Sequence, residues 1–319
     1  MTKTKQSQEN YSTKDPVSVS VDHEKNKDKM AIRSASRIVN SIRTMEGEGI
    51  VVNRSLPKER ELDPFLLLDE FGPIDLAPGQ AGGVPDHPHR GFETVTYMLD
   101  GRFEHKDSQG HSGKLSPGDV QWMTAGAGIV HSEMPEKEFV RTGGRLHGFQ
   151  LWVNLPKRDK MINPRYQEIP ASKIPVAKTK DGQVTVRIIA GEALGKKAVI
   201  DTRTPIMYLH FTLQTNSEIV QHVPNDYNAF AYIVNGTGNF GKNERSAQRG
   251  QMVIFARDGE EVSIRTPADA TSPLDVLLLA GVPLNEPIAQ YGPFVMSTPK
   301  EIYQAIEDYR SGKMGRINF

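Results

Sequence analysis

One pattern of residue types occurs twice in this 319-residue chain, and this repeat limits the possible folds more than any other feature. The apolar run 94–99 ends at Asp100-Gly101, and the similar run 229–234 ends at Asn235-Gly236, 135 positions further on. Asp-Gly and Asn-Gly after such runs are typical of hairpin turns between antiparallel strands. Because the repeat is far longer than the unit of a solenoid, the sequence predicts two copies of one β domain.

The turn residues indicate the same fold class. The chain has 28 Gly and 21 Pro, and its short apolar runs alternate with turns. Many short strands at this spacing predict an all-β fold, either a sandwich or a barrel. We place the boundary at Asn163-Pro164, which separates an N-terminal domain of residues 30–163 from a C-terminal domain of residues 164–319. Residues 1–29 are polar and have almost nothing to bury, so we expect a disordered tail.

Composition excludes several classes of protein. The 39 basic and 39 acidic residues balance, which argues against direct binding to nucleic acid or to an anionic membrane surface. No window approaches the roughly 18 apolar residues that span a bilayer, and the N-terminus does not resemble a signal peptide. We therefore expect a cytoplasmic protein, or a nuclear one in a eukaryotic cell. The absence of Cys excludes disulfides, thiolate metal ligands and cysteine nucleophiles.

One helix is predicted, at the C-terminus. Thr298 and Glu301 have the spacing of a capping box, and Pro299 suits the first turn. Apolar residues follow at helical spacing, and Gly312 provides a stop. This pattern is typical of an amphipathic helix packed on a barrel.

Two short motifs predict a metal site. In a strand, residues i and i+2 point to the same face, so His87-Pro88-His89 presents two imidazoles and His131-Ser132-Glu133 presents an imidazole and a carboxylate. If both motifs line one barrel, three nitrogens and one oxygen converge. Such ligands favour Fe(II), Mn, Ni, Cu or Zn, and without thiolate a closed structural zinc site is disfavoured. On an octahedral ion, two positions would stay open for a substrate and dioxygen.

Other polar residues near these motifs leave alternatives open. Glu93 lies four residues after His89 and would share its face in an unbroken strand. It could be a fifth ligand, or an acceptor that orients a histidine from behind. His105, His111 and His147 belong to no paired spacing, and we interpret them as surface groups or as neighbours of the ligands.

The second copy serves as an internal control. Shifted by 135 positions, His87 falls on His222. The same shift places His89 on Pro224. Counted from the equivalent glycines Gly118 and Gly250, His131 falls on Ser263 and Glu133 on Arg265, so only one of the four ligands recurs. We therefore expect metal in the N-terminal domain and none in the C-terminal domain.

Four segments of the chain resemble the pirin family of the cupin superfamily: residues 62–71, 87–97, 126–133 and 292–296. The resemblance covers about residues 31–319 and implies two tandem cupin (jelly-roll) β-barrels with a short C-terminal helix. It implies one Fe(II) in the first barrel, with other divalent metals possible. The family's metal ligands match His87, His89, His131 and Glu133. Glu93 occupies the usual cupin glutamate position, which in pirins lies behind the ligands.

The resemblance also implies two alternative functions. The first is a quercetin 2,3-dioxygenase-like enzyme that cleaves flavonol-type substrates with dioxygen, and we expect Glu133 to accept the flavonol hydroxyl proton. The alternative is an iron-dependent, redox-sensing regulatory protein that binds protein partners in the manner of a transcription coregulator. An enzyme needs a substrate-sized opening at the metal, whereas a regulator could have a sealed site.

Overall fold

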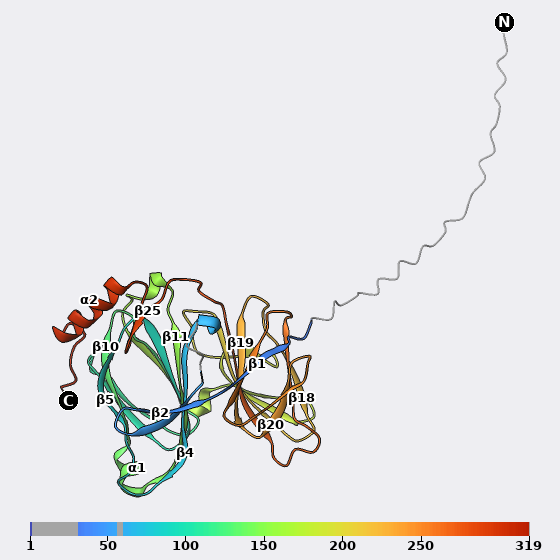
Figure 1. Ribbon diagram of the computed structural model, residues 1–319, viewed down its shortest axis with the longest axis horizontal. Helices are drawn as coiled ribbons and strands as arrows, with labels where there is room; N and C mark the ends of the chain where they lie inside the picture. Colours follow the sequence, from blue (N-terminus) through green and yellow to red (C-terminus); the bar gives the residue numbers. More distant parts are fainter. Residues whose placement is uncertain (2–30, 56–59, 319) are drawn as a thin grey trace.

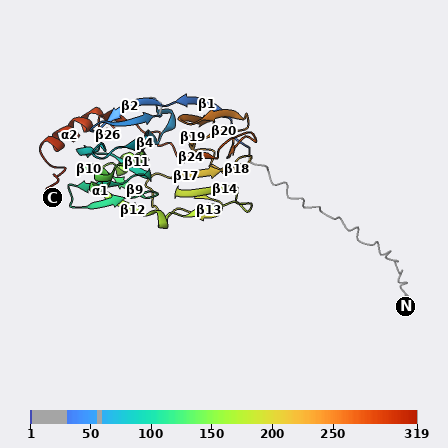
Figure 2. The same ribbon diagram turned by 90° about the horizontal axis from the view of Figure 1, so that it is seen from below.

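A computed structural model describes Met1, residues 31–55 and residues 60–318. Apart from Met1, the predicted tail of residues 1–29 lies outside the described residues. The rest forms two β-barrels side by side, with the C-terminal helix against the first barrel (Figure 1). Figure 2 shows the same two barrels from below. The prediction of an all-β fold with two tandem cupin barrels and a short C-terminal helix is confirmed.

Each barrel consists of a seven-stranded and a four-stranded antiparallel sheet. In the first barrel the strand orders are β12-β9-β6-β11-β4-β3-β2 and β5-β10-β7-β8. Its strands are β2 (Ile42–Glu46), β3 (Ile50–Arg54), β4 (Phe65–Leu76), β5 (Val84–His89), β6 (Phe92–Asp100), β7 (Phe103–Asp107), β8 (Ser112–Leu115), β9 (Val120–Thr124), β10 (Ile129–Pro135), β11 (Gly144–Asn154) and β12 (Arg165–Ile169).

The second barrel repeats this arrangement, with strand orders β1-β22-β19-β24-β17-β14-β13 and β18-β23-β20-β21. Its strands are β1 (Ala35–Asn40), β13 (Val176–Lys178), β14 (Val184–Ala190), β17 (Ile206–Leu213), β18 (Glu218–His222), β19 (Asn228–Asn235), β20 (Thr237–Phe240), β21 (Arg245–Gln248), β22 (Gln251–Phe255), β23 (Glu261–Arg265) and β24 (Leu274–Gly281). The remaining elements are the hairpins β15 (Glu192–Ala193) with β16 (Lys196–Lys197) and β25 (Ala289–Tyr291) with β26 (Phe294–Met296), the helices α1 (Lys137–Thr142) and α2 (Pro299–Arg310), and the 3-10 turns η1 (Arg60–Leu62), η2 (Lys157–Asp159) and η3 (Ala171–Lys173).

The repeated turns occur at the predicted residues, but they are not hairpins. β6 pairs with β9 and β11, and β19 pairs with β22 and β24, so each turn leads into a strand of the other sheet of its barrel. β6 ends at Asp100 and β19 at Asn235, and the following Gly101 and Gly236 have φ values of 86° and 82°. Glycine adopts such positive φ values without steric strain, which explains why it follows Asp and Asn here.

Two strands are exchanged between the halves of the chain. β1 precedes every strand of the first barrel, yet it pairs antiparallel with β22 of the second barrel, from Ala35 opposite Phe255 to Asn40 opposite Gln251. Figure 1 shows β1 and β2 running from one barrel to the other. In the opposite direction, β12 lies beyond the predicted boundary at residue 163 but pairs with β9. The limits of the two domains as units stay a prediction.

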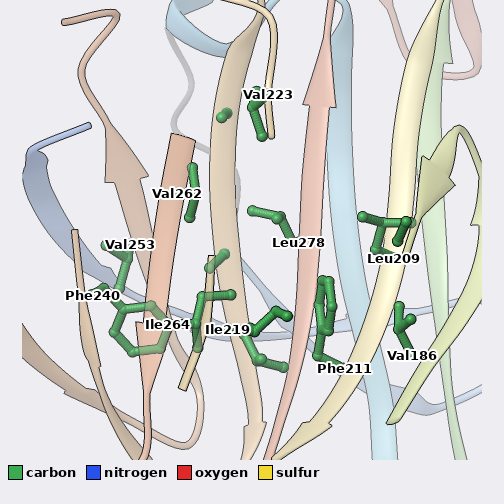
Figure 3. Packing of buried hydrophobic residues seen from close by; sticks show 14 of the residues in the cluster. Val186, Leu209, Phe211, Ile219, Val223, Phe240, Val253, Val262, Ile264 and Leu278 are labelled. Atoms are coloured by element: carbon green, nitrogen blue, oxygen red, sulfur yellow. The ribbon is translucent and has the colours of Figure 1, made fainter. Parts of the chain in front are cut away.

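The barrels are filled differently. The second barrel encloses a large apolar core in which Phe211, Phe240, Ile264 and Leu278 are 0% exposed (Figure 3). The first barrel buries polar residues instead, as described below. A shared layer of apolar side chains joins the barrels, with Trp122 of the first and Tyr208 of the second among its members.

The C-terminal helix α2 has the predicted cap. Thr298 Oγ1 accepts from the Glu301 backbone N–H, and Glu301 Oε2 accepts from the Thr298 N–H at 2.8 Å. Its buried side chains Ile302 and Ala305 join a cluster that includes Val130 of β10. Within the described ranges, neither helix is long and apolar enough to cross a membrane.

Lys160 is a buried cation that ties three segments together. Its Nζ donates to Gly91 O at 2.8 Å, to Asn154 Oδ1 at 2.6 Å and to Val295 O at 3.0 Å. Burial lowers the pKa of Lys160 to about 8. The three acceptors belong to the loop before β6, to β11 and to β26, so one ammonium group links the C-terminal hairpin to the first barrel.

We expect Lys160→Met to destabilise the protein by about 3 kcal/mol, because three buried acceptors lose their donor. Urea unfolding followed by circular dichroism measures this change. Lys157→Met is the matched control, since the Lys157 side chain is exposed, and its effect should stay within about 0.5 kcal/mol. Equal effects of the two substitutions would contradict the assigned role of Lys160.

Candidate metal centre

Two neighbouring strands of the first barrel bring the three predicted histidine ligands together. β5 ends with His87 and His89, and β10 contributes His131, which lies directly opposite His87 in the antiparallel register. One ring nitrogen from each of His87, His89 and His131 lies within 4.8 Å of the other two. The i, i+2 spacing within β5 and the pairing of β5 with β10 together produce this convergence.

The geometry of His87 and His89 suits a shared ion. His87 Nδ1 lies 2.7 Å from the carbonyl oxygen of Pro85, which can only accept, so Nδ1 carries the proton and Nε2 has a free lone pair. This Nε2 is 3.0 Å from Nε2 of His89. Two nitrogens bound at right angles to one ion at about 2.1 Å lie about 3.0 Å apart. Metal-bound histidines usually donate their other N–H to such a carbonyl.

His131 has buried polar atoms that lack a partner. It is 0% exposed, and neither ring nitrogen has a hydrogen-bond partner within the described part of the chain. Buried polar atoms are rarely left unpaired, and a bound ion would satisfy one of these nitrogens. Burial lowers the pKa of His131 and of His89 well below the usual 6.5, and the neighbouring imidazole of His87 lowers both further. Both rings are therefore neutral at pH 7, which is the form that binds metal.

Glu133 is fixed in place by two side chains from the facing sheet. Its Oε1 accepts from Thr96 Oγ1 at 2.9 Å, and its Oε2 accepts from Gln150 Nε2 at 2.8 Å. Gln150 is itself oriented by Trp152 Nε1, which donates to Gln150 Oε1 at 3.1 Å. The carboxylate lies two residues after His131 on β10, and its role as a metal ligand stays a prediction.

The glycine-rich bend before β10 allows the close packing that positions His131. At Gly126, where φ is +50°, an added Cβ would lie 2.1 Å from Ile162 O. The backbone must therefore pass this carbonyl without a side chain. Ala127 N, the next donor, bonds the same oxygen at 2.8 Å and fixes the bend.

The structure places Glu93 differently from the sequence-based expectation. β5 ends at His89, and Gly91 with a φ of +87° separates it from β6, so the strand is broken and the alternation of faces restarts. Thr96, three residues after Glu93, points towards Glu133, whereas Glu93 lies on the opposite face of β6 and accepts from Thr124 Oγ1 at 2.6 Å. Burial raises the pKa of Glu93. No hydrogen bond between Glu93 and the three histidines is found among the described residues.

The other histidines of this region have distinct places. His147 is buried between the barrels, where its Nε2 lies 2.8 Å from Glu70 Oε1. The His111 side chain is 58% exposed, and its Nδ1 lies 2.9 Å from Asp107 Oδ2. His105 is 2% exposed and lies directly opposite Glu133 in the register of β7 and β10.

His105 and Asp107 therefore belong to the wall of the candidate metal centre. The sequence analysis left His105 open between a surface group and a neighbour of the ligands, and it did not single out Asp107. Their positions on β7 face Glu133 and His131 of β10. Glu168 forms a hydrogen bond to His105 Nε2, and the ring of Tyr166 stacks on His105 with centroids 5.2 Å apart. The sequence contains a pattern that could have identified both residues: His105-Lys106-Asp107 has the same i, i+2 spacing as the two motifs that predict the site.

Access to the centre is narrow. His89, His131 and Glu133 are at most 4% exposed, and His87 is the partly exposed member of the set. The rings of Phe92 and Trp152 cover His89, with centroids 5.1 Å and 5.4 Å from its own. The arrangement is a largely buried group of three imidazoles beside the hydrogen-bonded carboxylate of Glu133 and an aromatic wall.

Comparison with known proteins identifies the family. The family models for pirin and for the pirin C-terminal cupin domain match residues 49–153 and 208–315. The chain belongs to the pirin family. This pirin-family chain is 52% identical over 272 residues to a pirin-like protein from Solanum lycopersicum, covering 85% of this chain and 89% of the relative. It is 46% identical over 273 residues to pirin from Homo sapiens, covering 85% and 90%.

A solved structure with this fold is that of a quercetin 2,3-dioxygenase from Acinetobacter baumannii. It superposes with a TM-score of 0.84 at 36% sequence identity, over 90% of this chain and 100% of the other. The predicted resemblance to pirins is thus confirmed, and the histidine cluster lies within the segment that the first family model matches.

Proposed function

We propose that this pirin-family protein is an Fe(II)-dependent dioxygenase that acts on flavonol-type substrates. The observation that supports this most is the convergence of one ring nitrogen from each of three histidines within 4.8 Å of one another. The likeness to a quercetin 2,3-dioxygenase at 36% identity supports a flavonol as the substrate class. Another divalent metal could occupy the same ligands, since imidazole binds several first-row ions.

The side chains divide the work of such a site. His87, His89 and His131 would hold the ion, and Glu133 would complete the set as the anionic ligand. When bound, the ion would supply Lewis-acid and redox chemistry towards the flavonol and dioxygen. Phe92 and Trp152 exclude water from one side and offer an aromatic surface to a planar substrate.

Oxygen consumption tests this proposal. Protein purified without oxygen should contain about one iron per chain, and it should take up oxygen when quercetin is added. His89→Ala protein, treated in the same way, should do neither. Iron without oxygen uptake on any flavonol would refute the dioxygenase activity and leave the metal site intact.

Glu133→Gln separates the proposed proton transfer from metal binding. The amide keeps the shape of the carboxylate but cannot accept a proton from the flavonol hydroxyl. We expect iron to be retained with weaker affinity and the rate of flavonol turnover to fall by about 10²-fold or more. A variant that keeps its iron and turns over flavonol at the wild-type rate would show that Glu133 is not the base.

The burial of the site favours a second candidate function. Three of the four predicted ligands are at most 4% exposed, which suits an iron-dependent regulatory protein whose surface responds to the oxidation state of the metal. Its partner would be a protein rather than nucleic acid, because the chain has no net charge. Iron binding without flavonol turnover, combined with different hydrogen exchange of the Fe(II) and Fe(III) forms, would support this function instead.

A further inference from the structure

A cavity of about 300 Å³ lies away from the metal centre, at the junction of the two halves of the chain. The β2–β3 hairpin and the part of β4 after Gly72 form it on the side of the first barrel. On the other side, Arg249 from the turn between β21 and β22 of the second barrel closes it. None of the four predicted metal ligands lines this cavity.

The wall of the cavity is apolar and continuous with a hydrophobic cluster. Ile50, Ile74, Leu76 and Leu146 line it. Leu146 is buried, and Ile50 and Leu76 pack against the cluster that it belongs to. Ile74 is 44% exposed, which is unusual for a large apolar side chain at a cavity. These apolar side chains could pack against the apolar part of a ligand.

The charged side chains that line the cavity are all positive. Arg43 from β2 and Arg249 both line it, and neither guanidinium has a hydrogen-bond or ion-pair partner in residues 31–55 and 60–318. Among the described side chains that line the cavity, none is acidic. Two uncompensated guanidinium groups at one apolar cavity favour an anion, and the planar fork of arginine matches a carboxylate best.

The amides at the same cavity leave room for a further hydrogen bond. Gln80 uses its Oε1 to accept from Ala77 N at 3.3 Å, so its NH₂ group stays available to a ligand oxygen. Asn53 directs its own NH₂ to Glu70 Oε2 at 3.4 Å.

We propose that this cavity is a second ligand site, and that it binds a small carboxylate with an aromatic or branched aliphatic body. The carboxylate would lie between Arg43 and Arg249, and the apolar body would lie against Ile50, Ile74 and Leu146. Because the two arginines belong to different barrels, the bound ligand would connect the barrels and raise the melting temperature by mass action. The site is independent of the function proposed above, since it shares no residue with the metal centre.

Calorimetric titration of the full chain with 2-naphthoate tests this site. We expect one molecule per chain, bound equally by metal-free and metal-loaded protein. The neutral isostere 2-naphthamide should bind about tenfold more weakly or worse, because it cannot form charge-assisted bonds with guanidinium. Arg43→Gln/Arg249→Gln should weaken 2-naphthoate binding by about tenfold or more. Ile74→Trp should block both compounds by filling the cavity.

Arg203→Gln is the matched control, because Arg203 is exposed and does not line the cavity, and it should leave binding unchanged. Circular dichroism and melting temperature verify that each variant is folded. Three outcomes would overturn the site: no detectable binding, binding that the double substitution does not weaken, or binding that requires metal and disappears in His89→Ala. The last outcome would place the carboxylate at the metal centre.

Discussion

A His131→Ala protein is expected to lose its divalent metal, with an affinity at least about 100-fold below that of the wild type. Changes of groups that only orient metal ligands already cost about 10–100-fold, and His131 would be a ligand itself. It is the histidine that β10 contributes to the cluster, so without it the two imidazoles that remain both come from β5, two residues apart. The loss should also remove the stabilisation that the metal gives, about 2.7 kcal/mol when the ion is present at 100 times its dissociation constant.

Metal content after desalting, together with melting curves at increasing Fe(II) or Ni(II), measures this effect. His111→Ala is the matched control, because it removes an imidazole from the same barrel whose side chain is 58% exposed and lies outside the cluster. It should bind metal like the wild type. If His131→Ala retained wild-type affinity, the ion would have to be bound elsewhere, and the ligand set proposed here would be wrong.

Asp308→Ala is expected to destabilise the protein by about 3 kcal/mol, the cost of breaking a buried ion pair. Arg90 Nη1 donates to Asp308 Oδ2 at 2.9 Å, with the two side chains 6% and 12% exposed. The Nε of Arg90 donates to Ala127 O at 2.7 Å. Arg90 directly follows His89, and Ala127 belongs to the bend before His131. Without the carboxylate, a buried guanidinium would be left with one partner fewer.

Glu307→Ala is the control on the same helix. Glu307 pairs with Arg310 at 3.7 Å, but both side chains are at least 70% exposed, so its removal should change the free energy of unfolding by at most about 0.5 kcal/mol. Urea unfolding of the two variants gives the comparison. Equal free energies of unfolding would show that the Arg90–Asp308 pair contributes nothing.

The contribution of Asp308 also has a predictable pH dependence. Lys313, Gln304 and Arg90 hold the pKa of Asp308 at about 2, below its usual 3.8. A carboxyl group whose pKa is lowered by folding stabilises the protein above its unfolded pKa. The difference in stability between wild type and Asp308→Ala should therefore be complete above about pH 4 and shrink as the pH falls towards 2.

Local patterns were sufficient to predict the all-β class, the two copies of one domain and the three clustered histidines, whereas the two cupin barrels were implied by the resemblance to pirins. The turns at Gly101 and Gly236 and the cap at Thr298 depend on a few neighbouring residues, so their sequence patterns locate them. Which strands pair on either side of a turn is not a local property, and both turns join two sheets instead of forming hairpins. The alternation of faces within β5 then placed His87 and His89 on one side. Each of these inferences depends only on the spacing of residues within one strand, turn or helix.

The sequence analysis misplaced side chains where the alternation of inward and outward faces is interrupted between or within strands. A break of two residues after His89 placed Glu93 on the opposite face from the one expected. In the second barrel the alternation differs by one residue, so His222, which the repeat aligns with His87, is exposed and Gln221 points inward, at 7% exposure. A shift of one residue moves every side chain of a strand to the other face, and a simple offset cannot detect such a shift. The pairing of β1 with β22 was equally inaccessible, because it joins distant parts of the chain.

The exchange of β1 has a consequence for synthesis on the ribosome. β1 is made first of all the strands, but its partner β22 appears about 200 residues later. At about 5–20 residues per second, the nascent chain must keep this strand unpaired for on the order of ten seconds or more. The first barrel can close during that time, whereas β1 must wait for the second barrel as an open edge that invites pairing with other chains. The pairing of this early strand with the late barrel can therefore take place only after β22 has emerged from the ribosome.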